Sequence, residues 1–178
     1  YDCIARVYAK RDRGIVPETF EVKEALKSFI KLLPPQARVL DVGSGAGRDS
    51  RFLHQYGLQV LGIDFSDKMI HEARKSSPGI VFRVMNFEYL KFKLNQFDGV
   101  WANASLHHIP KKKILRVLTT IHRIMKKNGV LFIKVKYGRG EQLRTDVKFG
   151  KRITRYFAFY RAAEMHKFLR GAGFEIFS

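Results

Sequence analysis

The sequence contains one cysteine, no apolar run long enough to cross a membrane, and few acidic residues for its basic ones. A single cysteine excludes a framework of disulfides within the chain. A membrane-spanning helix needs roughly 18 consecutive apolar residues, and neither such a run nor a signal peptide is recognisable. The six histidines lack the spacing of metal ligands. We therefore expect a cytoplasmic protein of one domain, with no metal site and no membrane partner.

The charge of the chain is strongly positive and unevenly placed. The 178 residues include 34 Lys and Arg against 16 Asp and Glu, for a formal net charge of +18. Residues 1–110 hold 16 basic and 12 acidic residues, whereas residues 111–178 hold 18 and 4. Such asymmetry can mark a face for nucleic acid. Basic charge spread over helix surfaces is more often a solvated face, and we favour that interpretation.

One stretch stands out, a short apolar run followed by three alternating glycines, Gly43, Gly45 and Gly47. Glycine lets the backbone turn sharply and lets a ligand approach closely, because it has no Cβ. Asp64 follows 21 positions after Gly43, at the end of a second apolar run. A carboxylate in that place can accept hydrogen bonds from both hydroxyls of a ribose. The pattern therefore predicts a ligand that contains a nucleoside.

Two common phosphate-binding patterns do not fit this loop. The dinucleotide fingerprint G-x-G-x-x-G needs a third glycine where Arg48 stands, or where Ser50 stands in the other register. Asp41, inside the first apolar run, is also foreign to that fingerprint. A Walker-type loop needs a Gly-Lys-Ser/Thr sequence, and none follows the glycines. The predicted ligand is therefore neither a nicotinamide dinucleotide nor a nucleotide held by a Walker loop.

Apolar runs and helical patterns alternate along the chain, which predicts a parallel sheet with right-handed crossovers. Apolar runs between turn residues predict strands over 38–42, 59–63, 80–84, 97–102, 129–136 and 174–177. Apolar periodicity and capping residues predict helices over 2–11, 19–33, 67–76, 111–127 and 162–170, and one from the glycines to about Gly57. Ligands of such sheets bind beyond the carboxyl ends of the strands, where the glycines and Asp64 fall.

The spacing Asp-x-Gly-x-Gly-x-Gly over 41–47 resembles the first motif of the class I S-adenosylmethionine-dependent methyltransferases. Four further stretches resemble later motifs of that family in the same order: 62–70, 97–108, 126–132 and 171–174. The resemblance implies an α/β fold, a Rossmann-like three-layer α/β/α sandwich with a mostly parallel sheet. The family sheet ends in a seventh, antiparallel strand, and the sequence stops before one, so we expect the final strand to be missing.

The resemblance also divides the single domain 1–178 into four parts. These are N-terminal lid helices (1–36), a cofactor-binding core (37–136), a flap over the acceptor site (137–161), and a last helix and strand (162–178). The implied cofactor is S-adenosylmethionine, with S-adenosylhomocysteine as its product.

The cofactor residues that the resemblance implies lie at the ends of the predicted strands. Asp64 would bind the ribose, Asp41 would hold the loop or the amino group, and Arg48 would pair with the carboxylate. Asn86 stands where the family usually has an Asp that accepts from adenine, and an amide oxygen can accept the same bond. The full predicted set is Asp41, Gly43, Ser44, Gly45, Gly47, Arg48, Asp64, Phe65, Asn86, Phe87, Asn103, Ala104 and Ser105.

Catalytic residues on the acceptor side are harder to predict from the sequence. Methyl transfer from a sulfonium needs mainly positioning of the acceptor, and it needs a base only if the acceptor arrives protonated. His107 is our candidate for that base, with a packed structural histidine as the alternative, and His108 is a weaker candidate. The residues predicted to line the acceptor site are Tyr1, Tyr8, His107, Tyr137, Tyr156 and Tyr160.

Three functions stay open at the level of sequence. The lid helix and the aromatic flap favour a methyltransferase for a small molecule, and the basic flap would suit an anionic acceptor. The basic C-terminal half would suit an RNA methyltransferase acting on tRNA or rRNA. The third function is a cofactor-binding domain without catalysis that acts by binding RNA or protein. The salt dependence of ligand binding distinguishes these functions, because the affinity for nucleic acid falls steeply as salt rises. The sequence assigns no oligomeric state.

Overall fold

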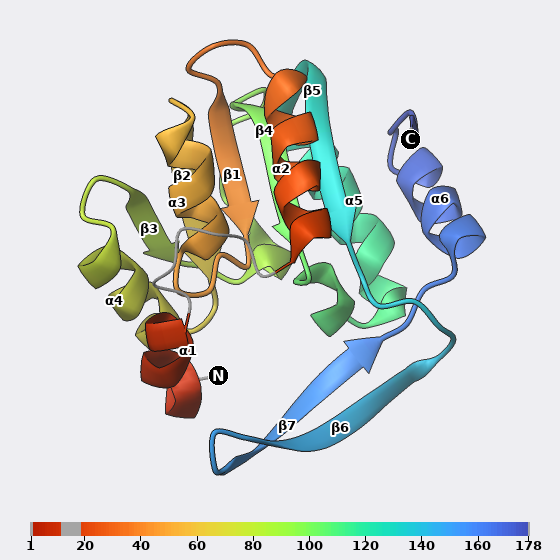
Figure 1. Ribbon diagram of the computed structural model, residues 1–178. Coiled ribbons are helices and arrows are strands. Elements are labelled where there is room, and N and C mark those ends of the chain that lie inside the picture. The colour runs from red at the N-terminus through yellow and green to blue at the C-terminus, as the bar shows by residue number, and fades with distance from the viewer. Residues whose placement is uncertain (1, 12–18, 178) are drawn as a thin grey trace.

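The computed structural model describes residues 2–11 and 19–177, and its centre is a parallel sheet of five strands in the order β3-β2-β1-β4-β5 (Figure 1). All neighbours pair in parallel, as the sequence predicts. The strands run over Arg38–Val42 (β1), Gln59–Asp64 (β2), Val81–Val84 (β3), Phe97–Asn103 (β4) and Met125–Lys134 (β5). The order of the strands reverses between β1 and β4, and ligands of such sheets bind at that reversal.

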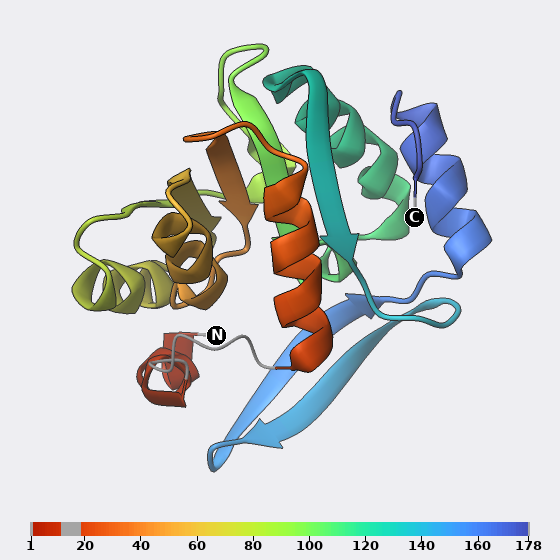
Figure 2. The same cartoon turned by 45° about the horizontal axis from the view of Figure 1, so that its top comes forward.

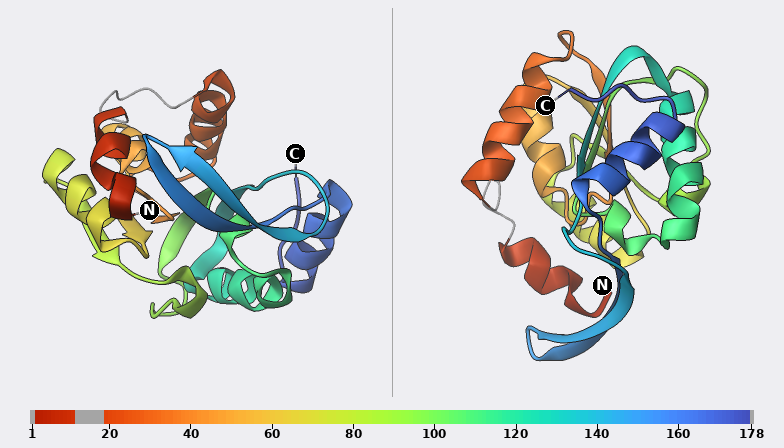
Figure 3. Two further views of the ribbon diagram at one scale, coloured as in Figure 1. Left: turned by 90° about the horizontal axis from the view of Figure 1, so that it is seen from below. Right: turned by 90° about the vertical axis from the view of Figure 1, so that its right-hand side faces the viewer.

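Helices cover both faces of the sheet and make three layers. They are α2 (Phe20–Lys31), α3 (Arg48–Gln55), α4 (Asp67–Ser76), α5 (Lys111–Ile124) and α6 (Ala162–Gly171), whereas α1 (Ala5–Arg11) packs against α4. Helices α2, α3 and α4 share one apolar core with the sheet, and α5 and α6 share the other. The right-hand view of Figure 3 shows α2 and α5 on opposite sides of the strands. The predicted three-layer α/β/α sandwich is confirmed.

The alternation of side chains along β1 explains why both faces are covered. Val39 lies in the core that contains Leu26 and Phe29 of α2, whereas Leu40 lies in the core that contains Ile114 of α5. A strand buried on both faces reads as a continuous apolar run, which is the pattern of the sequence here. Val39 and Leu40 are both fully buried.

At the C-terminal side one predicted helix is three residues too long and one predicted strand is wrong. The helix predicted over 111–127 ends at Ile124, because Met125 adopts an extended backbone and pairs with Phe97 across a bulge. The strand predicted over 174–177 does not form among the described residues, and this segment lies along β5 without pairing with it. The sheet therefore has five strands in the part of the chain that the structure describes.

The segment predicted as a flap forms a β-hairpin, which the strand predictions missed. Its strands are β6 (Glu141–Lys148) and β7 (Lys151–Ala158), which pair with each other in antiparallel fashion. The hairpin projects from the main sheet (Figure 2) and passes across the carboxyl ends of the strands, on the same side as α1 (Figures 1 and 3). Together α1 and the hairpin therefore cover the end of the sheet where the glycine loop lies.

Candidate functional site

The turn between β1 and α3 is built from glycines that other residues could not replace without strain. Gly43, Gly45 and Gly47 all have positive φ angles, of 78°, 53° and 83°. A Cβ on Gly43 would lie 2.4 Å from the Cβ of Ser105, which no side chain tolerates. The amides of Gly43 and Ser44 both donate to the carbonyl of Ile63 at 2.8 and 2.9 Å. The loop is thus folded tightly against the end of β2.

Asp64 closes this arrangement from the last position of β2. Its Oδ2 accepts from the amide of Gly45 at 3.0 Å, and its Oδ1 accepts from the amide of Ser66 at 2.9 Å. Only 8% of Asp64 is exposed, and burial raises the pKa of its carboxyl above the usual value. A carboxylate oxygen can accept more than one hydrogen bond, so Asp64 retains capacity for two ligand hydroxyls.

Behind the loop, two buried acids and their partners link β1, α3 and β4. Asp41 accepts from the hydroxyl of Ser50 at 2.5 Å, and burial together with the charge of Asp49 raises the pKa of Asp41 to about 8. Asp49 accepts from Trp101 Nε1 at 3.0 Å and from Asn103 Nδ2 at 2.8 Å. The sequence analysis missed Asp49, because an acid in the first turn of a helix is ordinarily a response to the helix dipole.

Arg48 pairs with this network within the chain. Its Nε lies 2.8 Å from Oδ1 of Asp49. The predicted contact of Arg48 with a cofactor carboxylate therefore stays a prediction, although Arg48 does line the cavity described next.

A cavity of about 330 Å³ opens in front of the loop, and we call it the glycine-loop cavity. Twelve of the predicted residues line it: Tyr8, Asp41, Gly43, Ser44, Gly45, Arg48, Asp64, Phe65, Phe87, Asn103, Ala104 and Ser105. His108, the weaker candidate for the base, also lines the cavity, and the structure adds six residues that the sequence analysis missed: Thr19, Val22, Ala46, Asp49, Met69 and Lys134. The volume lies within the range of cavities that hold small ligands.

Two buried hydroxyls in this cavity indicate that it is made for a polar ligand. The Oγ atoms of Ser44 and Ser105 are buried, and neither has a hydrogen-bond partner among the described residues. A buried hydroxyl without a partner is costly. Both would be satisfied by a ligand that brings amino, carboxylate or hydroxyl groups, so the cavity fits S-adenosylmethionine chemically.

Several predicted site residues lie elsewhere. Gly47 does not line the glycine-loop cavity, and Asn86 instead caps a short turn by accepting from the amide of Glu88 at 2.9 Å. Tyr156 lies on the hairpin, where its hydroxyl donates to Glu141. Tyr1 lies outside the described residues.

His107, the predicted base, is buried rather than presented to the cavity. Only 4% of it is exposed, and its ring lies against Phe157 at 5.5 Å between ring centres. Burial lowers the pKa of His107 to about 3. Its neighbour His108 is half-buried, lines the glycine-loop cavity, and has Nδ1 2.7 Å from the carbonyl of Tyr156. The structure therefore brings the second histidine of the pair to the site.

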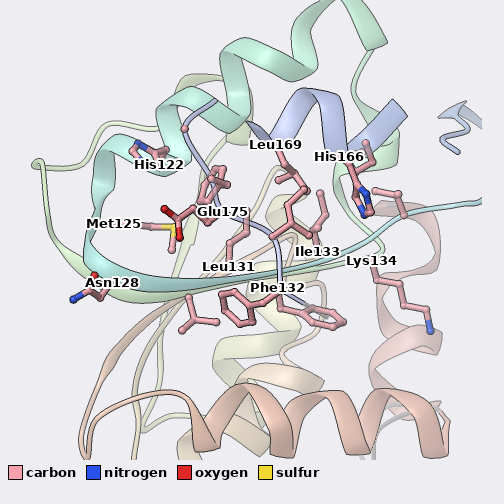
Figure 4. A pocket seen from close by; sticks show the side chains of 18 of the residues that line it. His122, Met125, Asn128, Leu131, Phe132, Ile133, Lys134, His166, Leu169 and Glu175 are labelled. Atoms are coloured by element: carbon pink, nitrogen blue, oxygen red, sulfur yellow. The ribbon is translucent and has the colours of Figure 1, made fainter. Parts of the chain in front are cut away.

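A larger cavity of about 1190 Å³ runs along β5 and is separate from this chemistry (Figure 4). Leu131, Ile133 and Leu169 give it apolar walls, and Glu175 of the C-terminal segment lies beside it. Tyr137 and Tyr160, predicted for the acceptor site, line this β5 cavity instead. Lys134 borders both cavities, but no glycine loop and no buried carboxylate is among the lining residues of the β5 cavity, so the glycine-loop cavity is the candidate site.

Two negative findings hold for the described residues. No group of three or more His, Cys, Asp or Glu side chains among residues 2–11 and 19–177 is placed to hold a metal ion. None of the helices in these ranges is both long and apolar enough to cross a membrane.

Comparison with known proteins points in one direction. A family model described as a methyltransferase domain matches residues 40–133. The chain is 35% identical over 105 residues to 2-methyl-6-phytyl-1,4-hydroquinone methyltransferase of Synechocystis sp., an alignment that covers 57% of this chain and 32% of that protein. The match thus spans about a third of the length of that curated relative.

Two solved structures share the fold. A SAM-dependent methyltransferase from Methanosarcina mazei superposes with a TM-score of 0.74 at 23% identity, covering 83% of this chain and 84% of that one. The 1,6-didemethyltoxoflavin-N1-methyltransferase of Burkholderia thailandensis, solved with 1,6-didemethyltoxoflavin and S-adenosylhomocysteine bound, superposes with a TM-score of 0.62 at 24% identity. That alignment covers 83% of this chain and 66% of the other.

Proposed function

The chain belongs to the methyltransferase domain family, and on that premise we propose that it transfers a methyl group from S-adenosylmethionine to a small molecule. One observation carries this proposal: the buried carboxylate of Asp64 is fixed beside the glycine loop by the amides of Gly45 and Ser66. That geometry is suited to a ribose, and the matched family supplies the rest of the ligand's identity.

The residues of the cavity have distinct tasks in this reaction. S-adenosylmethionine, when bound, supplies a methyl group on a positively charged sulfur. Asp64 accepts from the ribose hydroxyls, and the hydroxyls of Ser44 and Ser105 gain the partners that they otherwise lack. Phe65 and Phe87 offer apolar surface for the adenine. Helix α1 and the hairpin exclude water, so positioning and a dry site provide most of the acceleration.

Support for a small acceptor comes from the relatives. The Synechocystis and Burkholderia proteins are named for methylation of a hydroquinone and of 1,6-didemethyltoxoflavin, both small molecules. The cation of Lys134 lines the cavity and suits an anionic acceptor. The acceptor's charge and the cytoplasmic location stay predictions.

The first test is calorimetric titration with S-adenosylhomocysteine. We expect micromolar binding by the wild type and a loss of about 100-fold or more in Asp64→Ala, because two hydrogen bonds to a charged group disappear. Asp67→Ala is the matched control, since Asp67 is an exposed acid three residues later that does not line the cavity, and it should bind within a few-fold of wild type. No binding by a folded wild type would contradict the proposal.

RNA methylation is a second candidate, which the excess of basic residues in 111–178 favours. The same titration with an RNA duplex or hairpin at 50 and 200 mM salt separates the two functions. If the basic surface binds RNA, raising the salt from 50 to 200 mM should lower the RNA affinity by orders of magnitude. The affinity for S-adenosylhomocysteine should change little over the same range.

A further inference from the structure

His108 occupies a position from which it can act on a ligand. It lies on a short 3-10 turn, Leu106–His108, directly after β4, and it lines the glycine-loop cavity together with Ser105. Both histidine rings pack against Phe157, at 5.5 Å for His107 and 4.8 Å for His108 between ring centres, but His107 does not line that cavity. The turn therefore gives the two adjacent histidines different surroundings, one closed and one open to the site.

The hairpin determines which ring nitrogen of His108 carries the proton. Nδ1 lies 2.7 Å from the carbonyl oxygen of Tyr156 on β7. A carbonyl oxygen can only accept, so Nδ1 must donate, and in the neutral ring the lone pair is then on Nε2. This tautomer is assigned from the bonding partner. A histidine oriented by a backbone carbonyl in this way has the arrangement of a general base.

The charges around His108 favour a neutral ring and an anionic ligand. Burial lowers the pKa of His108, and the cations of Arg155, Lys136 and Lys148 lower it further, while the bond to Tyr156 opposes them. His107, whose ring centre lies 4.4 Å from that of His108, is a further titratable neighbour, and its pKa is also lowered. Lys134 adds a cation to the wall of the cavity, and its Nζ is 3.7 Å from a carboxylate oxygen of the largely exposed Glu21.

We propose that His108 is the base that takes the proton of a weakly acidic hydroxyl, a phenol or an enol, and that Lys134 stabilises the oxyanion so formed. This proposal rests on the proposed methyltransferase function. A carboxylic acid arrives ionised and needs no base. A methylated amine carries positive charge when its proton is retained, and the cations named above disfavour that charge.

The proton and electron balance of the step is simple. The hydroxyl proton moves to Nε2 of His108, which becomes a cation. The acceptor oxygen uses the electron pair that it keeps to bond the methyl carbon, and the pair of the broken carbon–sulfur bond stays on sulfur as a neutral thioether. His108 then returns its proton to solvent.

Two phenols test the proposal because they differ in ionisation. Hydroquinone is protonated at neutral pH, whereas 4-nitrophenol is largely ionised at slightly alkaline pH and needs no base. We expect His108→Gln to lower kcat for hydroquinone by about 10²–10⁴-fold and to leave kcat for 4-nitrophenol within a few-fold. His71→Gln, at an exposed position on α4, is the control and should leave both rates unchanged.

Three further readouts do not depend on one variant. The wild-type rate with hydroquinone should fall at acid pH, with a midpoint below the usual histidine range, whereas the rate with ionised 4-nitrophenol should not. Imidazole should partly rescue His108→Ala. The phenolate absorbance of 4-nitrophenol bound with S-adenosylhomocysteine should appear at higher pH in Lys134→Met than in wild type.

Four results would overturn the inference. Equal losses on both phenols in a variant that still binds S-adenosylhomocysteine would show a structural role for His108. A loss confined to hydroquinone in His107→Gln but absent in His108→Gln would assign the base to the other histidine. An unchanged phenolate absorbance in Lys134→Met would remove the cation from the proposal. Normal binding of S-adenosylhomocysteine without methylation of either phenol would reject the acceptor class and leave the proposed function standing.

Discussion

The inner wall of the glycine-loop cavity, residues 41–49 and Asp64, is held by hydrogen bonds of loop amides and of neighbouring side chains at the strand ends. The outer wall, α1 and the hairpin that packs on it, is held by side-chain contacts between distant segments. On the inner wall, the amides of Gly43 and Gly45 are bonded to the end of β2. On the outer wall, Phe149 of the hairpin turn contacts Tyr8 of α1 at 5.7 Å between ring centres, and Lys148 donates to the hydroxyl of Tyr8 at 3.3 Å. The fold thus fixes the wall that we propose binds the cofactor, and we expect the outer wall to be the more adaptable of the two.

The largest expected effect belongs to the inner wall, where Asp41 should make the free energy of unfolding depend on pH. Asp41 retains its proton in the folded protein up to a pKa of about 8, but the unfolded chain loses that proton near pH 4. Between these values the unfolded state binds fewer protons, so the free energy of unfolding should fall as pH rises, by up to about 1.4 kcal/mol per pH unit. Urea unfolding at pH 5 and pH 8 measures this fall.

Asp41→Asn removes the titration and keeps an oxygen that can accept from Ser50. We expect its free energy of unfolding to change much less between pH 5 and pH 8 than that of the wild type, because the remaining groups titrate alike in both proteins. An equal fall in the free energy of unfolding of the two proteins would show that Asp41 ionises normally. Solvent would then reach the inner wall more readily than the structure indicates.

The second effect tests how rigid the inner wall is. Gly43→Ala places a Cβ 2.4 Å from Ser105 at a positive φ, and it should lower the free energy of unfolding by about 2–4 kcal/mol. Gly45→Ala is the matched variant, with a positive φ but no atom within 4 Å of the new Cβ, and should cost about 1 kcal/mol. Denaturant unfolding of both variants gives the comparison. Equal costs would mean that the loop moves away from Ser105 easily.

The inner wall could be predicted from sequence because its pattern is local and its placement follows from topology. Glycines after a strand mark a turn with positive φ angles, and parallel strands bring Gly43 and Asp64 to one edge of the sheet whatever the details of packing. Asp49 escaped prediction because its partners, Trp101 and Asn103, are more than fifty residues away and no short pattern records them.

The outer wall could not be predicted in the same way. The contact of Lys148 with Tyr8 joins residues 140 positions apart. Aromatic residues in the flap predicted an acceptor site, yet Tyr137 and Tyr160 bridge to each other beside β5 and face the β5 cavity. Which of two adjacent histidines lines the glycine-loop cavity also depends on a short turn after β4, where the sequence carries no periodicity.

The smallest expected effect concerns the ring contact between Phe149 and Tyr8. Phe149 is 45% exposed, so Phe149→Ala should lower the free energy of unfolding by about 1 kcal/mol or less. Its larger consequence should be local, as faster amide hydrogen exchange in α1 with little change in affinity for S-adenosylhomocysteine. Leu143→Ala is the matched control, because Leu143 is on the same hairpin, is 72% exposed and lies outside the glycine-loop cavity.

Leu143→Ala should leave the exchange of α1 unchanged. If Phe149→Ala both speeded hydrogen exchange in α1 and lowered the affinity for S-adenosylhomocysteine by a similar free energy, the two walls would be one cooperative unit. The distinction between a fixed inner wall and an adaptable outer wall would then be lost. If only α1 responds, the hairpin and α1 can vary with the acceptor while the bonds that hold the cofactor residues stay the same.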